Sequence, residues 1–181
     1  MPLYTSILTT EQYGVAELLN NTIEIVLPLA TLCIVEALYR FSIDENTNHS
    51  ELFMNSLFVI VIGDIVVAIG SVVCYYCIGD TYALYFLLLF ITTTFYKVTC
   101  QFARGLGHVK RYALYGVTNS LILVASNVVL LGIFKGGVAA YLLSFSISYG
   151  ISGILALVFS REYKFIQKDQ LNFRSLKEML S

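Results

Sequence analysis

The sequence predicts an all-α protein, a polytopic bundle of membrane-spanning helices. Of its 181 residues, 57% are hydrophobic and only 13% are charged, and the mean hydropathy is +0.77, whereas soluble domains carry roughly 25% charged residues. Long uncharged stretches recur along the chain, and basic residues gather between alternate stretches. This composition excludes a disordered chain, and the balance of 11 Lys and Arg against 12 Asp and Glu gives no sign of nucleic-acid binding.

The first predicted span covers residues 15–40 and is the most polar of the set. At 100° per residue, four of its polar side chains fall on one narrow stripe. A polar stripe on a spanning helix is expected to face a bundle interior or a cavity. Pro28 removes one backbone hydrogen bond, which predicts a kink at that residue. The stripe consists of Glu17, Asn21, Glu24 and Thr31.

The second and third spans are expected at residues 52–78 and 81–97. Asp64 is the one charged residue between Glu51 and Asp80, so this stretch is long enough to cross a bilayer. The 16 uncharged residues before Lys97 form a short span, which side chains at its ends can extend by snorkelling.

The fourth and fifth spans are expected at residues 112–134 and 137–159. They are separated by Lys135, with 23 uncharged residues before it and 25 after it. Each stretch exceeds the roughly 20 residues that a spanning helix needs. Residues 1–160 therefore form the membrane domain, and residues 161–181 form a polar tail.

The distribution of basic residues predicts the orientation of the five spans. Ten of the 11 fall on one side, and Lys135 alone falls on the other. Short cytoplasmic loops carry the excess of Lys and Arg, so the tail is expected in the cytoplasm and the first residues outside. An external N-terminus without a signal peptide also suggests that a preceding helix is missing. The ten are Arg40, Lys97, Arg104, Lys110, Arg111, Arg161, Lys164, Lys168, Arg174 and Lys177.

Several short motifs resemble bacterial polysaccharide flippases, the O-antigen and capsule repeat-unit exporters of the multidrug/oligosaccharidyl-lipid/polysaccharide exporter superfamily. The stretches PLYTSILTTEQYGVAELL and PLATLCIVEALYRFSID are similar to the end of the family's first helix and to its second helix. The final RSLKEMLS resembles the start of its seventh helix. The matching positions are Leu8, Thr9, Tyr13, Gly14, Glu36, Ala37, Arg40, Phe41, Ala103, Arg104 and Gly105.

The resemblance implies a role in surface polysaccharide biosynthesis at the bacterial inner membrane. The chain would form most of the N-terminal lobe of a two-lobed transporter that flips undecaprenyl-pyrophosphate-linked oligosaccharides. A missing second lobe or a homodimer would complete it, since alternating access needs two lobes rocking about one site. Membrane lipids and polysaccharide polymerase or assembly proteins are the other implied partners.

Two pairs of residues are candidates for binding the substrate. Arg40 suits a pyrophosphate because guanidinium keeps its charge and matches phosphate geometry. The alternative is an ion pair with Glu36 four residues earlier. In the basic loop expected after residue 97, Arg104 and Lys97 are candidates near the cavity mouth, although the loop's charges also serve orientation and attraction to anionic head groups.

Two carboxylates within the spans are further candidates. Glu24 is either a solvated residue at the mouth of a cavity or a carboxylate that binds substrate or a coupling ion. Asp64 lies near the middle of its span, where a charge is costly, so it is a candidate for ion coupling. A protonated or paired Asp64 at a helix interface is the alternative.

Other function classes are disfavoured by the sequence. It contains no Gly-rich phosphate loop, no nucleophile elbow and no paired His ligands, so neither an enzyme nor a cofactor or metal site is expected. Two alternatives stay open. One is a non-transporting scaffold or regulator of a polysaccharide assembly complex, and the other is part of a related drug or cation antiporter.

Overall fold

The computed structural model describes residues 7–44, 47–79, 81–134, 136–159 and 162–165, with Leu176 and Met179. Within these ranges every regular element is a helix. Most of the expected polar tail lies outside the described residues, as do several basic residues used to predict orientation. Those residues are Lys135, Arg161, Lys168, Arg174 and Lys177.

The helices form the polytopic bundle that the sequence predicts. Four spans are long and apolar enough to cross a membrane, and a pair of helices bent by 65° makes a fifth if the pair counts as one span. In chain order the elements are α2 (Thr10–Ala30), α3 (Ile34–Ser42), α4 (His49–Ile78), α5 (Tyr82–Gly105), α6 (Val109–Asn127), the π-helix η1 (Val128–Ile133), α7 (Gly137–Phe159) and the 3₁₀-helix η2 (Glu162–Phe165).

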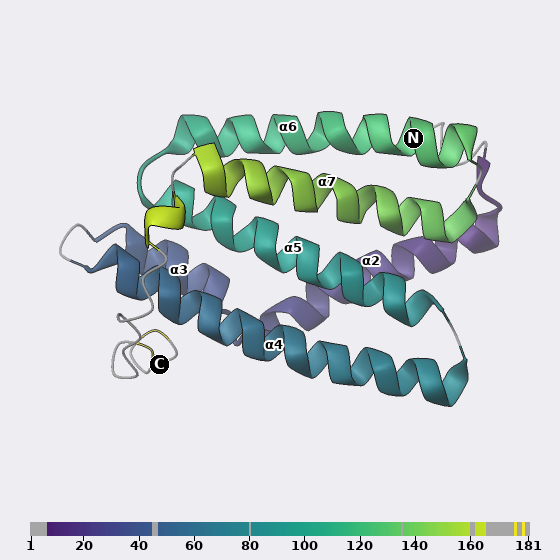
Figure 1. Cartoon of the computed structure of the whole chain (residues 1–181), viewed down its shortest axis with the longest axis horizontal. Helices are drawn as coiled ribbons and strands as arrows, with labels where there is room; N and C mark the ends of the chain where they lie inside the picture. Colours follow the sequence, from purple (N-terminus) through teal and green to yellow (C-terminus); the bar gives the residue numbers. More distant parts are fainter. Residues whose placement is uncertain are drawn as a thin grey trace.

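Helix α5 is the centre of the bundle. Figure 1 shows α4, α5, α7 and α6 lying side by side along the long axis, with α2 crossing them obliquely. Helix α5 packs against α3, α4, α6 and α7 and also contacts α2. The buried side chains of α5 therefore contact other helices of the bundle.

The outer faces of α4 and α6 are aliphatic and exposed. Val66 and Ile69 on α4 and Leu121 and Val124 on α6 each expose more than half of their surface. Such continuous apolar faces are unfavourable in water and favourable in lipid. The helices are thus those of a multi-pass membrane protein.

The break between α2 and α3 lies one turn beyond the kink expected at Pro28. Helix α2 stays α-helical through Pro28 and ends at Ala30. The chain then turns at Leu32 and Cys33, whose φ angles of 51° and 56° are left-handed. The prediction was wrong in position because a proline removes only one helical hydrogen bond, whereas two left-handed residues change the direction of the chain.

Helix α4 touches this break through a glycine. A Cβ added at Gly63 would lie 2.6 Å from the Ala30 carbonyl oxygen, so only glycine allows this approach. Two turns further along α4, a Cβ at Gly70 would meet nothing within 4 Å. Gly70 instead lines an apolar groove of about 460 Å³ between α2, α4 and α5. Helices α2 and α4 therefore meet at the break and diverge beyond it.

Candidate functional site

An ion pair joins two spanning segments of the bundle. The Lys97 Nζ on α5 donates a hydrogen bond to the Glu24 Oε2 on α2, at 2.6 Å. The two residues are 73 positions apart in the sequence, so the contact is made by the fold alone. Hydrogen bonds between charged groups are stronger than those between neutral groups.

The apolar edge of α2 fixes where Glu24 lies. Ala16, Ile23 and Leu27 are buried together with residues of α5 and α7. Their spacing of seven and four residues places them on one side of the helix. Glu24 directly follows Ile23, so its side chain leaves the helix at the border of this buried side.

Glu17 anchors the same polar stripe to α7. Its Oε1 accepts a hydrogen bond from the Tyr141 hydroxyl at 3.0 Å. The stripe expected from the sequence thus contacts α7 through Glu17 and α5 through Glu24, whereas Glu24 and Asn21 are also exposed. Thr31 lies at the break, where it is buried and bonds the Leu27 carbonyl.

The placement of Lys97 in a loop was wrong, because the residue lies within α5. Helix α5 extends to Gly105, about two turns beyond the span expected at residues 81–97. At 1.5 Å per residue, Lys97 lies about 12 Å inside the end of the helix. The prediction failed because it treated a lysine as the end of a span, whereas the pairing with Glu24 neutralises this charge within the membrane segment.

The ion pair is accessible from outside the bundle. The side chains of Lys97 and Glu24 expose 32% and 57% of their surface. Charges are expensive in hydrocarbon, so this face must border a water-filled cavity or another protein element rather than lipid. A water-filled cavity would let an external anion reach the Lys97 ammonium.

A second set of candidates lies at the end of the bundle. The Arg104 guanidinium stacks on Tyr39 of α3 at 4.5 Å and on Tyr112 of α6 at 5.5 Å. Arg40, next to Tyr39 in the sequence, lies 5.7 Å from the Phe41 ring. Arg104 belongs to α5 rather than to the loop in which it was expected, because α5 continues past the span end expected at residue 97.

The ion pair considered between Glu36 and Arg40 does not form. Both residues are described and exposed on α3, and no salt bridge joins them. An exposed pair at this spacing is worth only about 0.3–0.5 kcal/mol, which is too little to hold two long side chains together. Arg40 is therefore not neutralised by Glu36.

Asp64 lies apart from these residues, near the middle of α4. Its Oδ1 accepts a hydrogen bond from the Thr94 hydroxyl of α5 at 3.2 Å. Thr94 also donates to the Phe90 carbonyl at 2.6 Å, so its single hydroxyl proton is shared between that carbonyl and Asp64. Asp64 is thus placed at a helix interface, one of the two situations considered from the sequence.

The sequence did not predict the hydrogen-bond partners of Asp64 and Glu17. Thr94 belongs to a run of three threonines, and Tyr141 is one aromatic residue among many in an apolar helix. Neither pattern marks a contact to a carboxylate. A further polar contact joins α6 to α7, because the backbone and side-chain oxygens of Asn119 both lie 2.6 Å from the Ser148 hydroxyl.

Within the described ranges, no group of three or more His, Cys, Asp or Glu residues is arranged to hold a metal ion. The site instead offers one lysine, two arginines and separate carboxylates. Comparison with protein-family models, with curated proteins and with solved structures gives no match to this chain. The function proposed below therefore rests on the resemblance of the sequence motifs together with the chemistry of the site.

Proposed function

We propose that the chain forms one lobe of a bacterial inner-membrane flippase for lipid-linked oligosaccharides in surface polysaccharide biosynthesis. The substrate head carries a diphosphate, and its polyprenyl tail stays in the lipid. A second lobe, or a second copy of the chain, would cover the exposed polar face of α2 and α5. The two lobes would then rock about the site between them.

The observation that carries the proposal is the accessible Lys97 within a membrane span. A lysine is costly there unless it has a partner or a function. Its pairing with Glu24 at 2.6 Å neutralises it in the empty protein. An ammonium at this depth is suited to binding a phosphate that crosses the membrane.

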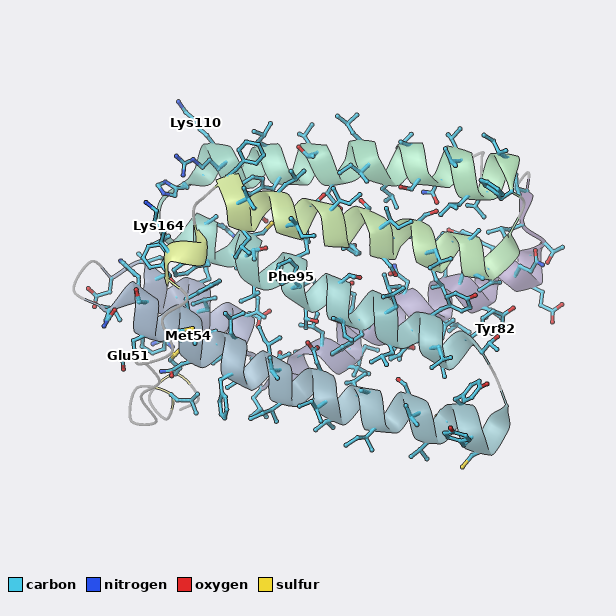
Figure 2. The ribbon with its side chains drawn as sticks, viewed as in Figure 1. Glu51, Met54, Tyr82, Phe95, Lys110 and Lys164 are labelled. Carbon is cyan, nitrogen blue, oxygen red and sulfur yellow. The ribbon has the colours of Figure 1, made fainter. Side chains whose placement is uncertain are left out.

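The arrangement of cations supports a route from one end of the bundle. Arg104 and Lys97 are seven residues apart on α5, so they lie on the same side of the helix, about 10 Å from each other. Lys110 and Lys164 lie at the same end of the bundle, opposite the end marked by Tyr82 (Figure 2). By the positive-inside rule this end is cytoplasmic. A diphosphate would meet Arg104 and Arg40 first and then Lys97.

The experiment that tests the proposal compares two lysines of α5 and α6. The complete protein is reconstituted with a fluorescent polyprenyl-diphosphate oligosaccharide, and the flipped fraction is measured by quenching from outside. We expect Lys97→Gln to slow flipping at least tenfold, because the phosphate loses its intramembrane partner. Lys110→Gln, which removes an exposed charge at the bundle end, should change the rate less than twofold.

Two outcomes would contradict the proposal. Flipping by Lys97→Gln at the wild-type rate would remove the phosphate-binding role. A wild-type protein that moves no lipid-linked sugar but co-purifies with polysaccharide assembly proteins would favour the scaffold.

A cation antiporter is the second candidate, and one observation favours it. Helices α2, α4 and α5 together hold five carboxylates, Glu17, Glu24 and Asp64 among them, against two basic residues, Lys97 and Arg104. Such an excess suits cationic substrates. Uptake of a cationic dye that depends on Glu24 but not on Lys97 would support this alternative.

A further inference from the structure

The contact between Glu24 and Lys97 is a single-point ion pair. In the part of the chain that the structure describes, Lys97 donates one hydrogen bond, to the Glu24 carboxylate. An ammonium has three donors, so this contact uses a third of its capacity. The Lys97 side chain is also one-third exposed, so further acceptors can reach it.

The Glu24 carboxylate is held loosely. Among the described residues it accepts one hydrogen bond, the one from Lys97, and more than half of its side chain is exposed. Glu17, two turns earlier on the same helix, is bonded to the Tyr141 hydroxyl and is less exposed. Glu24 can therefore leave Lys97 without breaking another hydrogen bond of its side chain.

A diphosphate is a stronger partner for Lys97 than a carboxylate. It carries more negative charge and more acceptor oxygens, so it can use the ammonium donors that Glu24 leaves idle. Both anions cannot share the ammonium closely without repelling each other.

We propose that the Glu24 carboxylate is a built-in competitor that occupies Lys97 in the empty site and must be displaced by the anionic head of the substrate. This inference rests on the proposed function and deepens it. Displacement keeps Lys97 neutralised in both states, so neither the empty nor the loaded site holds an isolated cation within the membrane. Repulsion between the displaced carboxylate and the bound phosphates then favours release.

The test is equilibrium binding of radiolabelled geranylgeranyl diphosphate to the full chain in lipid nanodiscs. Glu24→Gln removes the competing charge and leaves an amide that can still accept from Lys97. We expect it to bind the diphosphate about tenfold more tightly, equivalent to about 1.4 kcal/mol. The double variant Glu24→Gln with Lys97→Gln should lose this gain.

Glu17→Gln is the matched control, because it removes the same charge from the same helix without touching Lys97. Its affinity should stay within twofold of wild type, which separates direct competition from a general effect of charge. Equal or weaker binding by Glu24→Gln, with wild type still binding, would overturn the competitor role alone. Absence of diphosphate binding in wild type and Glu24→Gln alike would overturn both this inference and the proposed function.

Discussion

Replacing Gly63 with alanine tests whether α4 and the break after α2 are held in contact as the structure has them. The new Cβ would lie 2.6 Å from the Ala30 carbonyl oxygen and 3.1 Å from its carbon. Both neighbours are backbone atoms, so no side chain can rotate away. Helix α4 or the break must move by most of an ångström to restore an ordinary contact.

The expected cost follows from two opposing terms. Overpacking a close contact costs about 1–3 kcal/mol, whereas glycine to alanine within a helix gains about 1 kcal/mol in propensity. We therefore expect Gly63→Ala to lower the free energy of unfolding by up to about 2 kcal/mol. Gly70→Ala on the same helix meets nothing within 4 Å and should keep the propensity gain.

Thermal unfolding of the purified protein in detergent measures the difference. For a chain of this size, each kcal/mol shifts Tm by about 2–4 °C. We expect the Tm of Gly63→Ala to fall by several degrees below that of Gly70→Ala. If the two variants unfolded at the same temperature, or if Gly63→Ala were the more stable, the close approach of α4 to the break would be refuted.

Two further predictions concern polar contacts between helices. Ser148→Ala removes the hydroxyl that bonds Asn119 of α6, and should lower stability by about 0.6 and at most about 1.7 kcal/mol; Ser146→Ala, which loses a bond only to its own helix, is the control in the same thermal assay. Asp64→Asn keeps an oxygen for Thr94 and should leave folding intact; if Asp64 couples an ion, the variant should also lose gradient-dependent transport, and an unchanged transport rate would exclude that role.

The sequence determined the helical membrane fold because that fold depends on local composition. Uncharged stretches of more than 20 residues have few alternatives to crossing a bilayer. The described spans ending at Ile133 and Phe159 lie close to the expected ranges 112–134 and 137–159 for this reason. The sequence also predicted the polar stripe with Glu17 and Glu24, because helical periodicity fixes which residues share a face.

Only the tertiary structure decided which charges meet. From the sequence, Lys97 was taken as the end of a span. No local feature of the sequence indicates that Glu24, 73 residues earlier, lies 2.6 Å from it. The same holds for Asp64 and Thr94, which become neighbours when α4 packs against α5. A charge within the membrane is tolerated through a partner brought by the fold, and for that physical reason the candidate site emerged only when the helices were placed in space.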